Sequence, residues 1–425
     1  MTRWAAIGVC AMGVAFGQAA APVPMPAQLG LPQAEQMLLE RSLAVAASRG
    51  QLEAAQALRQ IAGYKPNPTL QLGAEQFPVH SNMPGTVPRF FSSNLDAATE
   101  PTYTAQFIRL YERGGKREAR VAQAEAQIDA AKAQILDSFR TQLWQLRQAF
   151  AAALLARENL KLAEAMDQEY QQTEDLTSIR VKSGDLAEME LYRVRTGRLP
   201  FKQAILDART AYQQALRDVA NLLNASAGGA EITGDFSNRP LRQSLEELVK
   251  TALDRRPDVT VARNNSRASD AGVRLAEAQR ARDISVTFEY QQVGNDSALG
   301  VITQIPLFMY NNQKAGVAQA VSMRRVAEAQ LRAAESQART DVEKAYQAYL
   351  TARGATALYG ADNLEQVQKL REAVAYSFKR GEASLFELLD AERTARQATI
   401  AYNQARASYQ LSLWQLEAAI GQPLE

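Results

Sequence analysis

The sequence predicts a mainly α-helical protein with a small β part, built as a duplicated repeat of two strands followed by a helical hairpin. Three observations predict this fold. The chain is rich in Ala, Gln, Glu and Arg and only 7% aromatic, which suits long helices packed side by side. Two segments, Val181–Arg195 and Phe378–Arg393, share a Lys, one residue, a Gly and an acid between long helical runs. Four short segments alternate apolar and polar residues, as half-exposed strands do.

Residues 1–21 have the features of an export signal. Arg3 is followed by an apolar stretch and then by small residues at the expected cleavage site, Gly17–Ala21. Cys10 is the only cysteine, and Val9 before it is larger than a lipoprotein signal prefers, so simple cleavage is favoured. The mature chain then has no disulfide and no thiolate metal site, and we expect it in the periplasm or beyond.

The first repeat is predicted to span residues 22–240. Its first helical run is stopped by Lys65–Pro68, whose prolines lack the backbone N–H that a helix needs. The next segment places Leu70 and Leu72 on one face and polar residues on the other, which predicts a strand. Gly114–Gly115 ends a second strand. The expected elements are a helix at about 33–62, strands at about 69–77 and 102–111, and helices at about 116–182 and 186–223.

The second repeat is predicted to span residues 241–425 in the same order. Gly184 and Gly381, read as the turns of two helical hairpins, are 197 residues apart. Val121 and Val317, each followed by Ala-Gln-Ala, are 196 residues apart, which indicates a duplication. The alternative is that two alanine-rich helical rods share composition alone. The expected elements are a helix at about 245–280 interrupted at Arg256–Pro257, strands at about 283–293 and 299–307, and helices at about 314–379 and 383–420.

Each expected strand has an apolar face and about nine residues, the length that a tilted strand needs to cross a bilayer. Four strands do not close a barrel, and an open sheet edge is not tolerated in lipid. The strands therefore predict an oligomer, and three chains would give an even-numbered barrel of twelve strands. The alternative is ordinary amphipathic strands packed on helices. Aromatic residues that would form interfacial girdles are Phe77, Tyr103, Phe107, Tyr111, Phe288, Tyr290, Phe308 and Tyr310.

Three motifs resemble those of the TolC-type outer membrane factors, which are the exit ducts of bacterial tripartite efflux and secretion systems. They are the segment Ala252–Val259 (ALDRRPDV), the segment Ile305–Phe308 (IPLF) and Gly381 with Glu387–Ala391 (ELLDA). The resemblance implies a homotrimer whose 12-stranded β-barrel in the outer membrane is continuous with a long periplasmic α-helical barrel. It also implies a passive exit duct for small molecules or metal cations.

The same resemblance implies the partners, which are outer membrane lipid, a periplasmic adaptor protein and an inner-membrane efflux pump of the RND type. The Pro66–Leu70 segment (PNPTL) resembles the heavy-metal branch of the family, which works with pumps of the cobalt–zinc–cadmium type. The two helix turns would be the periplasmic tips that contact the adaptor. The residues implied in this contact are Lys182, Gly184, Asp185, Lys379, Gly381 and Glu382.

Acids beyond the second tip glycine ring the periplasmic entrance in the resembled family. Glu387 and Asp390 occupy these positions, and Glu190 is their counterpart after the first tip. Three subunits would place six carboxylates around one axis, attracting cations and opposing closure. The alternative is that these acids are solvated and stabilised by the helix N-terminus. A Tyr and an Arg that lock some relatives closed are replaced by Phe378 and Ala383, so that lock is missing or built differently.

The sequence contains no recognisable catalytic, cofactor-binding or metal-binding motif. The net charge of +2 argues against a nucleic-acid partner. There is no Gly-rich phosphate loop, His/Cys cluster or nucleophile motif, and we predict no catalytic, cofactor or metal-binding residue. His80 is the sole histidine, which makes a tight transition-metal site unfavourable. The competing function is a non-channel periplasmic coiled-coil scaffold or an adaptor-like rod.

Overall fold

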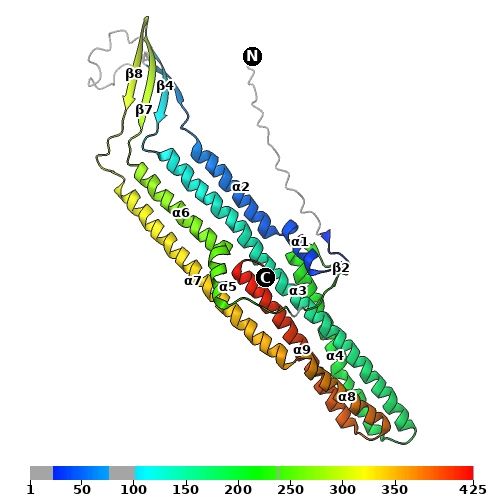
Figure 1. Ribbon diagram of the computed structural model, residues 1–425. Helices are drawn as coiled ribbons and strands as arrows, with labels where there is room; N and C mark the ends of the chain where they lie inside the picture. Colours follow the sequence, from blue (N-terminus) through cyan, green and yellow to red (C-terminus); the bar gives the residue numbers. More distant parts are fainter. Residues whose placement is uncertain (1–22, 76–100, 237–238, 425) are drawn as a thin grey trace, which may run out of the picture. The chain divides into compact units, whose positions relative to one another are not determined.

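The computed structural model describes residues 23–75, 101–236 and 239–424, and these form two compact units (Figure 1). The expected export signal with Cys10, and also Phe77 and His80, lie outside the described residues. Each unit takes segments from both halves of the sequence. The turn unit holds the described residues up to Leu43, Gln142–Pro240 and Leu350–Trp414, and the sheet unit holds Ala44–Thr141, Leu241–Tyr349 and the described residues from Gln415.

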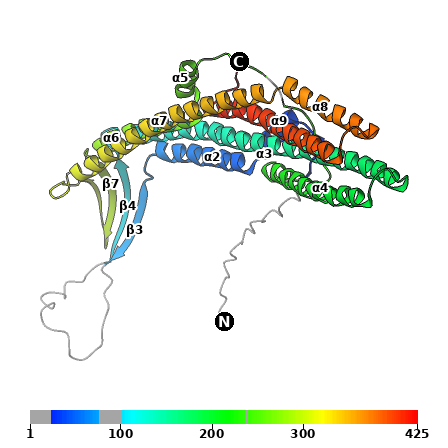
Figure 2. The same cartoon turned by 90° about the horizontal axis from the view of Figure 1, so that it is seen from below.

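The sheet unit contains an antiparallel sheet of four strands in the order β3-β4-β7-β8. Figure 2 shows β3, β4 and β7 side by side. Strands β4 and β7 pair at the centre, with Phe107 opposite Phe288. Strands β3 and β8 are the two edges, so the outer backbone groups of each have no strand partner in the described chain. The bounds are β3 (Thr69–Glu75), β4 (Thr102–Tyr111), β7 (Ile284–Val293) and β8 (Asp296–Gln304).

Strand β8 begins and ends three residues earlier than the sequence predicts. The hairpin turn is shorter than expected, because Gly294 takes a left-handed φ of 57° and Val293 already pairs with Asp296. The strand ends before Pro306, which has no N–H to donate to a ladder. Phe308 and Tyr310, expected as girdle aromatics, therefore lie beyond the strand.

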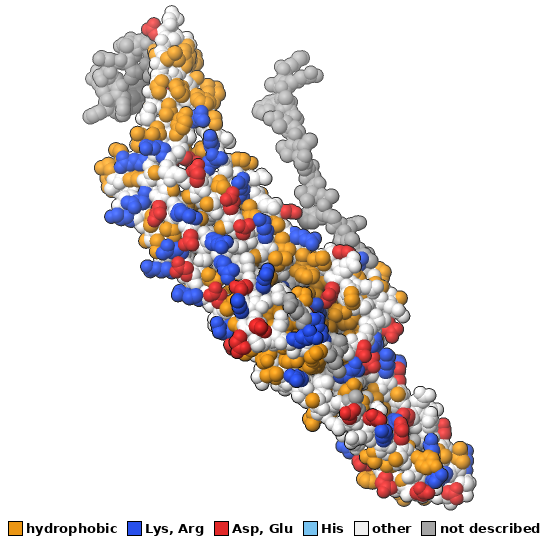
Figure 3. Space-filling view, in the orientation of Figure 1, with side chains coloured by type: hydrophobic (Ala, Val, Ile, Leu, Met, Phe, Trp, Pro, Cys, Tyr) orange, Lys and Arg blue, Asp and Glu red, His pale blue; other side chains and the backbone are white. Residues whose placement is uncertain are grey.

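The two faces of this sheet differ in character. Because paired residues share a face, the register places Leu70, Phe107, Phe288 and Val301 in one row. The neighbouring row on the same face contains Leu72, Ala105, Tyr290 and Leu299. Leu299 is 87% exposed and Leu72 is 72% exposed, and Figure 3 shows apolar side chains gathered over the strands. The opposite face carries mostly polar residues, including Gln71, Gln106, Glu289 and Gln291.

A buried arginine joins the helices of the sheet unit. Arg256 separates α5 from α6 with an extended ψ of 128°, at the interruption that the sequence predicted within residues 245–280. Its guanidinium donates to both carboxylate oxygens of Asp258 (3.0 and 2.7 Å) and to Asp341 (3.0 Å). The two carboxylates neutralise the buried cation, and the Ala419 carbonyl accepts a fourth hydrogen bond from it. The helices of this unit are α2 (Leu43–Gly63), the first part of α3 (Lys116–Lys182), α5 (Leu245–Arg255), α6 (Pro257–Ala278) and the first part of α7 (Lys314–Leu358).

The turn unit contains two helical hairpins, α3–α4 and α8–α9 (Figure 1). Two helices predicted as continuous are interrupted. The helix expected at 33–62 breaks at Ser42, whose ψ of 120° is extended, and the one expected at 314–379 breaks at Gly360, whose ψ is 168°. Ser and Gly both weaken a helix interior. The further bounds are α1 (Leu31–Arg41), α4 (Glu188–Leu222), α8 (Ala361–Arg380) and α9 (Leu385–Ile420).

Four two-residue strands were not predicted, since such short segments show no periodicity. They form two parallel pairs, β1 with β5 and β2 with β6. These pairs join the segment that precedes the first helix to the linker that follows α4. In the described ranges, no helix has both the length and the apolar character to cross a membrane. The bounds are β1 (Val23–Pro24), β2 (Gln28–Leu29), β5 (Ala225–Ser226) and β6 (Glu231–Ile232).

Candidate functional site

The two hairpins of the turn unit end in the same backbone turn. We call residues 181–187 the first tip and residues 379–384 the second tip. Gly184 has a φ of 86° and Gly381 a φ of 79°, which is the left-handed conformation that glycine adopts at helix ends. In the first tip Asp185 N donates to Arg180 O at 2.9 Å, and in the second Glu382 N donates to Ser377 O at 2.9 Å. The predicted turns therefore form at both glycines.

The structure brings the two tips together through one arginine. Arg180, near the end of α3, donates from Nη1 to the carbonyl oxygen of Phe378 at 3.2 Å. Its guanidinium carbon also lies 5.8 Å from the centre of the Phe378 ring, within range of a cation–π interaction. The sequence analysis did not single out Arg180. All six residues expected to contact an adaptor are exposed at these tips: Lys182, Gly184, Asp185, Lys379, Gly381 and Glu382.

An apolar cluster beneath the tips holds the helices in place. Phe378 is only 3% exposed and is one of the buried members of this cluster. The rings of Tyr170 and Phe201 lie with their centroids 4.3 Å apart. The sequence alone did not show that these residues meet. The buried members are Met166, Tyr170, Val194, Phe201, Phe378, Leu385 and Leu388.

The two acids expected at the entrance lie on the exposed face of α9. Glu387 and Asp390 are three residues apart, so they share one side of the helix, whereas Leu385 and Leu388 turn into the cluster. Glu387 also forms a capping box with Ser384: Ser384 N donates to Glu387 Oε2 at 2.7 Å, and Glu387 N donates to Ser384 Oγ at 3.2 Å. The hydrogen bonds from Ser384 lower the pKa of Glu387, so this carboxylate is ionised at neutral pH.

Glu190 occupies the corresponding position after the first tip but in a different setting. It accepts a hydrogen bond from Arg193 Nη1 at 2.9 Å and is half-buried. The N-cap residue here is Ala187, whose side chain cannot cap the helix. Glu190 therefore pairs with a cation of its own helix, whereas Glu387 caps the backbone.

A groove beside the second tip contains a buried acid that the sequence analysis missed. The groove encloses about 510 Å³ and is lined by Glu169, Arg371 and Glu392 among others. Glu392 is only 6% exposed, and its Oε2 atom accepts no hydrogen bond within the described chain. Burial, reinforced by the nearby Glu169 carboxylate, raises the pKa of Glu392 to about 7. Burial and the charge of Glu392 raise the pKa of Tyr170 to about 12.

Arg371 does not neutralise Glu392, because Glu169 holds it. Arg371 Nη1 donates to both carboxylate oxygens of Glu169, at 2.9 and 2.7 Å. Among the described residues, no group of three or more His, Cys, Asp or Glu side chains is arranged to hold a metal ion. The tips thus present exposed backbone and charge over a packed apolar base, an arrangement suited to contact with another protein.

Comparison with known proteins identifies the class to which this fold and these tips belong. The sequence profile described as outer membrane efflux protein matches residues 35–225 and 248–422, one match in each expected repeat, so the chain belongs to this family. The predicted family, the mainly α fold with a small β part, the outer membrane location and the efflux role are thereby confirmed. Proteins of this family and the structural relatives are channels rather than enzymes.

Among individual relatives, the chain is similar to the cobalt-zinc-cadmium resistance protein CzcC of Cupriavidus metallidurans. The two sequences are 24% identical over 306 residues, which cover 71% of this chain and 72% of CzcC. The fold is similar to that of CusC, with a TM-score of 0.76 and 16% identity over 92% of each chain. It is also similar to the outer membrane protein VceC of Vibrio cholerae, with a TM-score of 0.74 and 18% identity over 93% of this chain and 97% of VceC.

Proposed function

We propose that three copies of this chain assemble into one outer membrane channel with a closed barrel of twelve strands. The observation that supports this most is the four-stranded sheet, which has an apolar exposed face and two open edges at β3 and β8. Lipid offers no hydrogen bonds to an open edge, so each edge needs a strand from another chain. Joining β8 of one copy to β3 of the next satisfies every edge at once and gives an even-numbered barrel.

The two tips form the periplasmic end of this channel and contact an adaptor protein. The six exposed tip residues named above supply the contact, and Arg180 holds the tips in register. Three copies of Glu387 and Asp390 place six carboxylates around the entrance. Both side chains are exposed on α9, and the lowered pKa of Glu387 keeps it charged in spite of its neighbours. Such a ring attracts cations and excludes anions.

We further propose that the cargo includes divalent metal cations. The name of CzcC specifies resistance to cobalt, zinc and cadmium, and an acidic entrance suits such cargo. The channel is a passive duct without catalytic activity, and an inner-membrane pump of the RND type drives transport through the adaptor. The duct has no need to bind the metal tightly, because tight binding would slow release.

The assembly is tested by electrophoresis of outer membrane fractions without heating. We expect a heat-modifiable trimer of the 46.6 kDa chain, less its export signal, that dissociates to one band on boiling. A chain found only in the soluble periplasmic fraction as a monomer would contradict the channel and favour the coiled-coil rod.

The acidic entrance is tested with the double variant Glu387→Gln, Asp390→Asn in planar bilayers. These substitutions remove charge but keep the side-chain shape, so the capping box with Ser384 can still form. We expect the ratio of cation to anion permeability to fall severalfold. The control is Glu246→Gln, Asp254→Asn, which removes two exposed acids of α5 and should leave selectivity unchanged. If both variants had the same selectivity as the wild type, the proposal that Glu387 and Asp390 line the pore would be wrong.

A further inference from the structure

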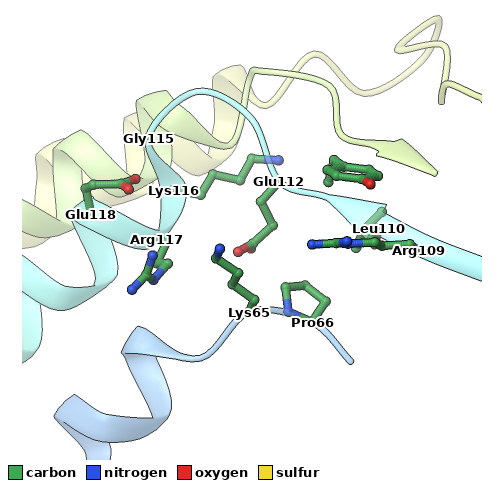
Figure 4. Close-up of a pocket in the computed structure, with 10 residues that line it drawn as sticks. Lys65, Pro66, Arg109, Leu110, Glu112, Gly115, Lys116, Arg117 and Glu118 are labelled. Atoms are coloured by element: carbon green, nitrogen blue, oxygen red, sulfur yellow. The ribbon is translucent and has the colours of Figure 1, made fainter. Parts of the chain in front are cut away.

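A cationic pocket lies in the sheet unit where the strands give way to the helices (Figure 4). It encloses about 290 Å³ between the segment before β3, the end of β4 and the start of α3. Figure 4 shows that Lys65 and Arg109 extend into it from two different segments. The charged residues that line it are Lys65, Arg109, Lys116, Arg117, Glu112 and Glu118.

The positive charge of this pocket is only partly neutralised. Lys116 pairs with Asp283 at 2.7 Å, and Glu112 is held by both terminal nitrogens of Arg120 at 2.6 and 2.8 Å. In the described part of the chain, by contrast, Lys65 and Arg109 form no ion pair with a carboxylate. These two side chains are also exposed, so a ligand can reach them.

Two further groups at the start of α3 favour an anion. Arg117 uses Nε to donate to the Gly63 carbonyl at 2.7 Å, which leaves its terminal nitrogens for other acceptors. The first backbone N–H groups of a helix point outward and attract negative charge. Of the two acids that line the pocket, Glu118 is the one that forms no ion pair with another described residue. Figure 4 shows that Glu118 and Arg109 lie on opposite sides of Gly115. The pocket therefore combines guanidinium, ammonium and helix N–H donors.

The position of the pocket on the sheet indicates the source of the anion. Arg109 shares its face with Phe107 and the row of exposed apolar residues, and lies about 7 Å farther along the strand. Its guanidinium carbon is 4.9 Å from the centre of the Tyr111 ring. The composition of this sheet face thus changes from apolar to aromatic and basic within a few residues. The surface of a membrane protein changes in the same way where the membrane meets water.

We propose that this pocket binds the phosphate of an anionic phospholipid headgroup at the periplasmic boundary of the outer membrane. This inference rests on the proposed barrel, in which the apolar face contacts lipid. Arg109 and Arg117 suit the phosphate oxygens because a guanidinium donates two parallel hydrogen bonds, and Lys65 adds a point charge. The lipid tails extend along the strand direction, over the apolar face that includes Phe107 and Leu70.

The inference is tested by native mass spectrometry of the full-length trimer in mild detergent, titrated with phosphatidylglycerol. We expect the double variant Lys65→Gln, Arg109→Gln to bind this lipid about 25-fold more weakly, since each cation near a membrane surface contributes about five-fold. The control Lys250→Gln, Arg255→Gln removes two exposed cations of α5 and should bind as the wild type does. The single variant Arg109→Lys, which keeps Lys65 and the positive charge at position 109, should bind phosphatidylglycerol almost as well as the wild type does.

Two further arms separate the sources of phosphate. Titration with phosphatidylcholine, whose headgroup has no net charge, should give weak binding, and inorganic phosphate should bind more weakly than phosphatidylglycerol. Equal binding of inorganic phosphate and phosphatidylglycerol would overturn the lipid assignment. Unchanged phosphatidylglycerol binding by a variant that still forms outer membrane trimers would overturn the site and leave the channel intact. Absence of trimers in the wild type would instead refute the proposed function.

Discussion

The two tips share the same backbone conformation but differ in their side-chain environments. Both use a left-handed glycine and the same pair of hydrogen bonds back to the helix. The first tip is held locally, with Ser183 Oγ donating to Arg180 O at 3.0 Å. The second tip is anchored from below by Phe378 and capped by Ser384. The glycine and the backbone therefore define the turn, and the side chains determine how firmly it is held.

The charges that flank the two tips are reversed. Ten residues before Gly184 and eleven after it, Glu174 and Arg195 form an ion pair at 2.9 Å. The equivalent positions around Gly381 are Arg371 and Glu392. Here no such pair forms, because Glu169 binds Arg371 with both oxygens. The second hairpin therefore contains a buried carboxyl with a raised pKa, and the first contains an exposed ion pair.

Phe378→Ala tests the anchoring of the second tip and should have the largest effect. Loss of this buried ring leaves a cavity and should lower local stability by about 3–5 kcal/mol. The equivalent change Val181→Ala, at a half-buried position of the first tip, should cost about 1 kcal/mol or less. Hydrogen–deuterium exchange of the tip peptides measures both. Similar losses of protection at the two tips would contradict the difference in anchoring.

Glu392→Gln tests the buried carboxyl through the pH dependence of stability. The pKa of about 7 exceeds the value of about 4.3 expected in the unfolded chain, so between these values the folded state binds the additional proton. Stability should therefore fall as the pH rises through this range. The shift corresponds to about 4 kcal/mol of folding stability. The Glu392→Gln variant should regain this stability at pH 8 but not at pH 4. Urea unfolding followed by circular dichroism across this range measures it.

A second variant shows how much the charge of Glu169 adds to the effect of burial on the pKa of Glu392. Glu169→Gln releases Arg371 to pair with Glu392 and should flatten the pH dependence. The exposed pair at the first hairpin provides the control, because Arg195→Gln should change stability by about 1 kcal/mol or less at any pH. Parallel stability curves for Glu392→Gln and the wild type would contradict the assignment.

Exchange of the caps should give the smallest effect. Ser384→Ala removes the capping box at the second tip and should cost about 1 kcal/mol. Ala187→Ser supplies the missing cap at the first tip, three residues before Glu190, and should stabilise it by up to about 1 kcal/mol. Exchange rates of the amides at the start of α4 and α9 measure both. An Ala187→Ser variant without added protection would show that Arg193 holds Glu190 too firmly for a capping box.

The strands, the long helices and the two turns could be predicted because each leaves a local pattern. Alternation identified β3, β4 and β7, and glycine identified the turns at Gly184 and Gly381. The helix breaks at Ser42 and Gly360 were missed because neither residue is followed by a proline to strengthen the signal. The start of β8 was missed because Asp296 and Ser297 are typical turn residues.

The candidate site was predictable only where function depends on exposed residues near a turn. Glu387 and Asp390 were named because the resembled family has acids just beyond the second tip glycine, but Glu392 could not be recognised as buried. The groups that interact with it electrostatically, Glu169 and Tyr170, are more than 200 residues earlier in the chain. Arg180 was missed for the same reason, because a basic residue near a helix end is ordinary until its partner is known.

In the proposed trimer, the open edges of β3 and β8 make the last step of folding intermolecular. A solitary copy inserted in the bilayer would leave two rows of peptide groups without water or partners, so insertion and association must occur as one event. Because three molecules take part, the rate of maturation should rise steeply with the concentration of newly exported chain. A fragment that keeps β3 but lacks β8 would then stop ring closure and inactivate the intact copies beside it.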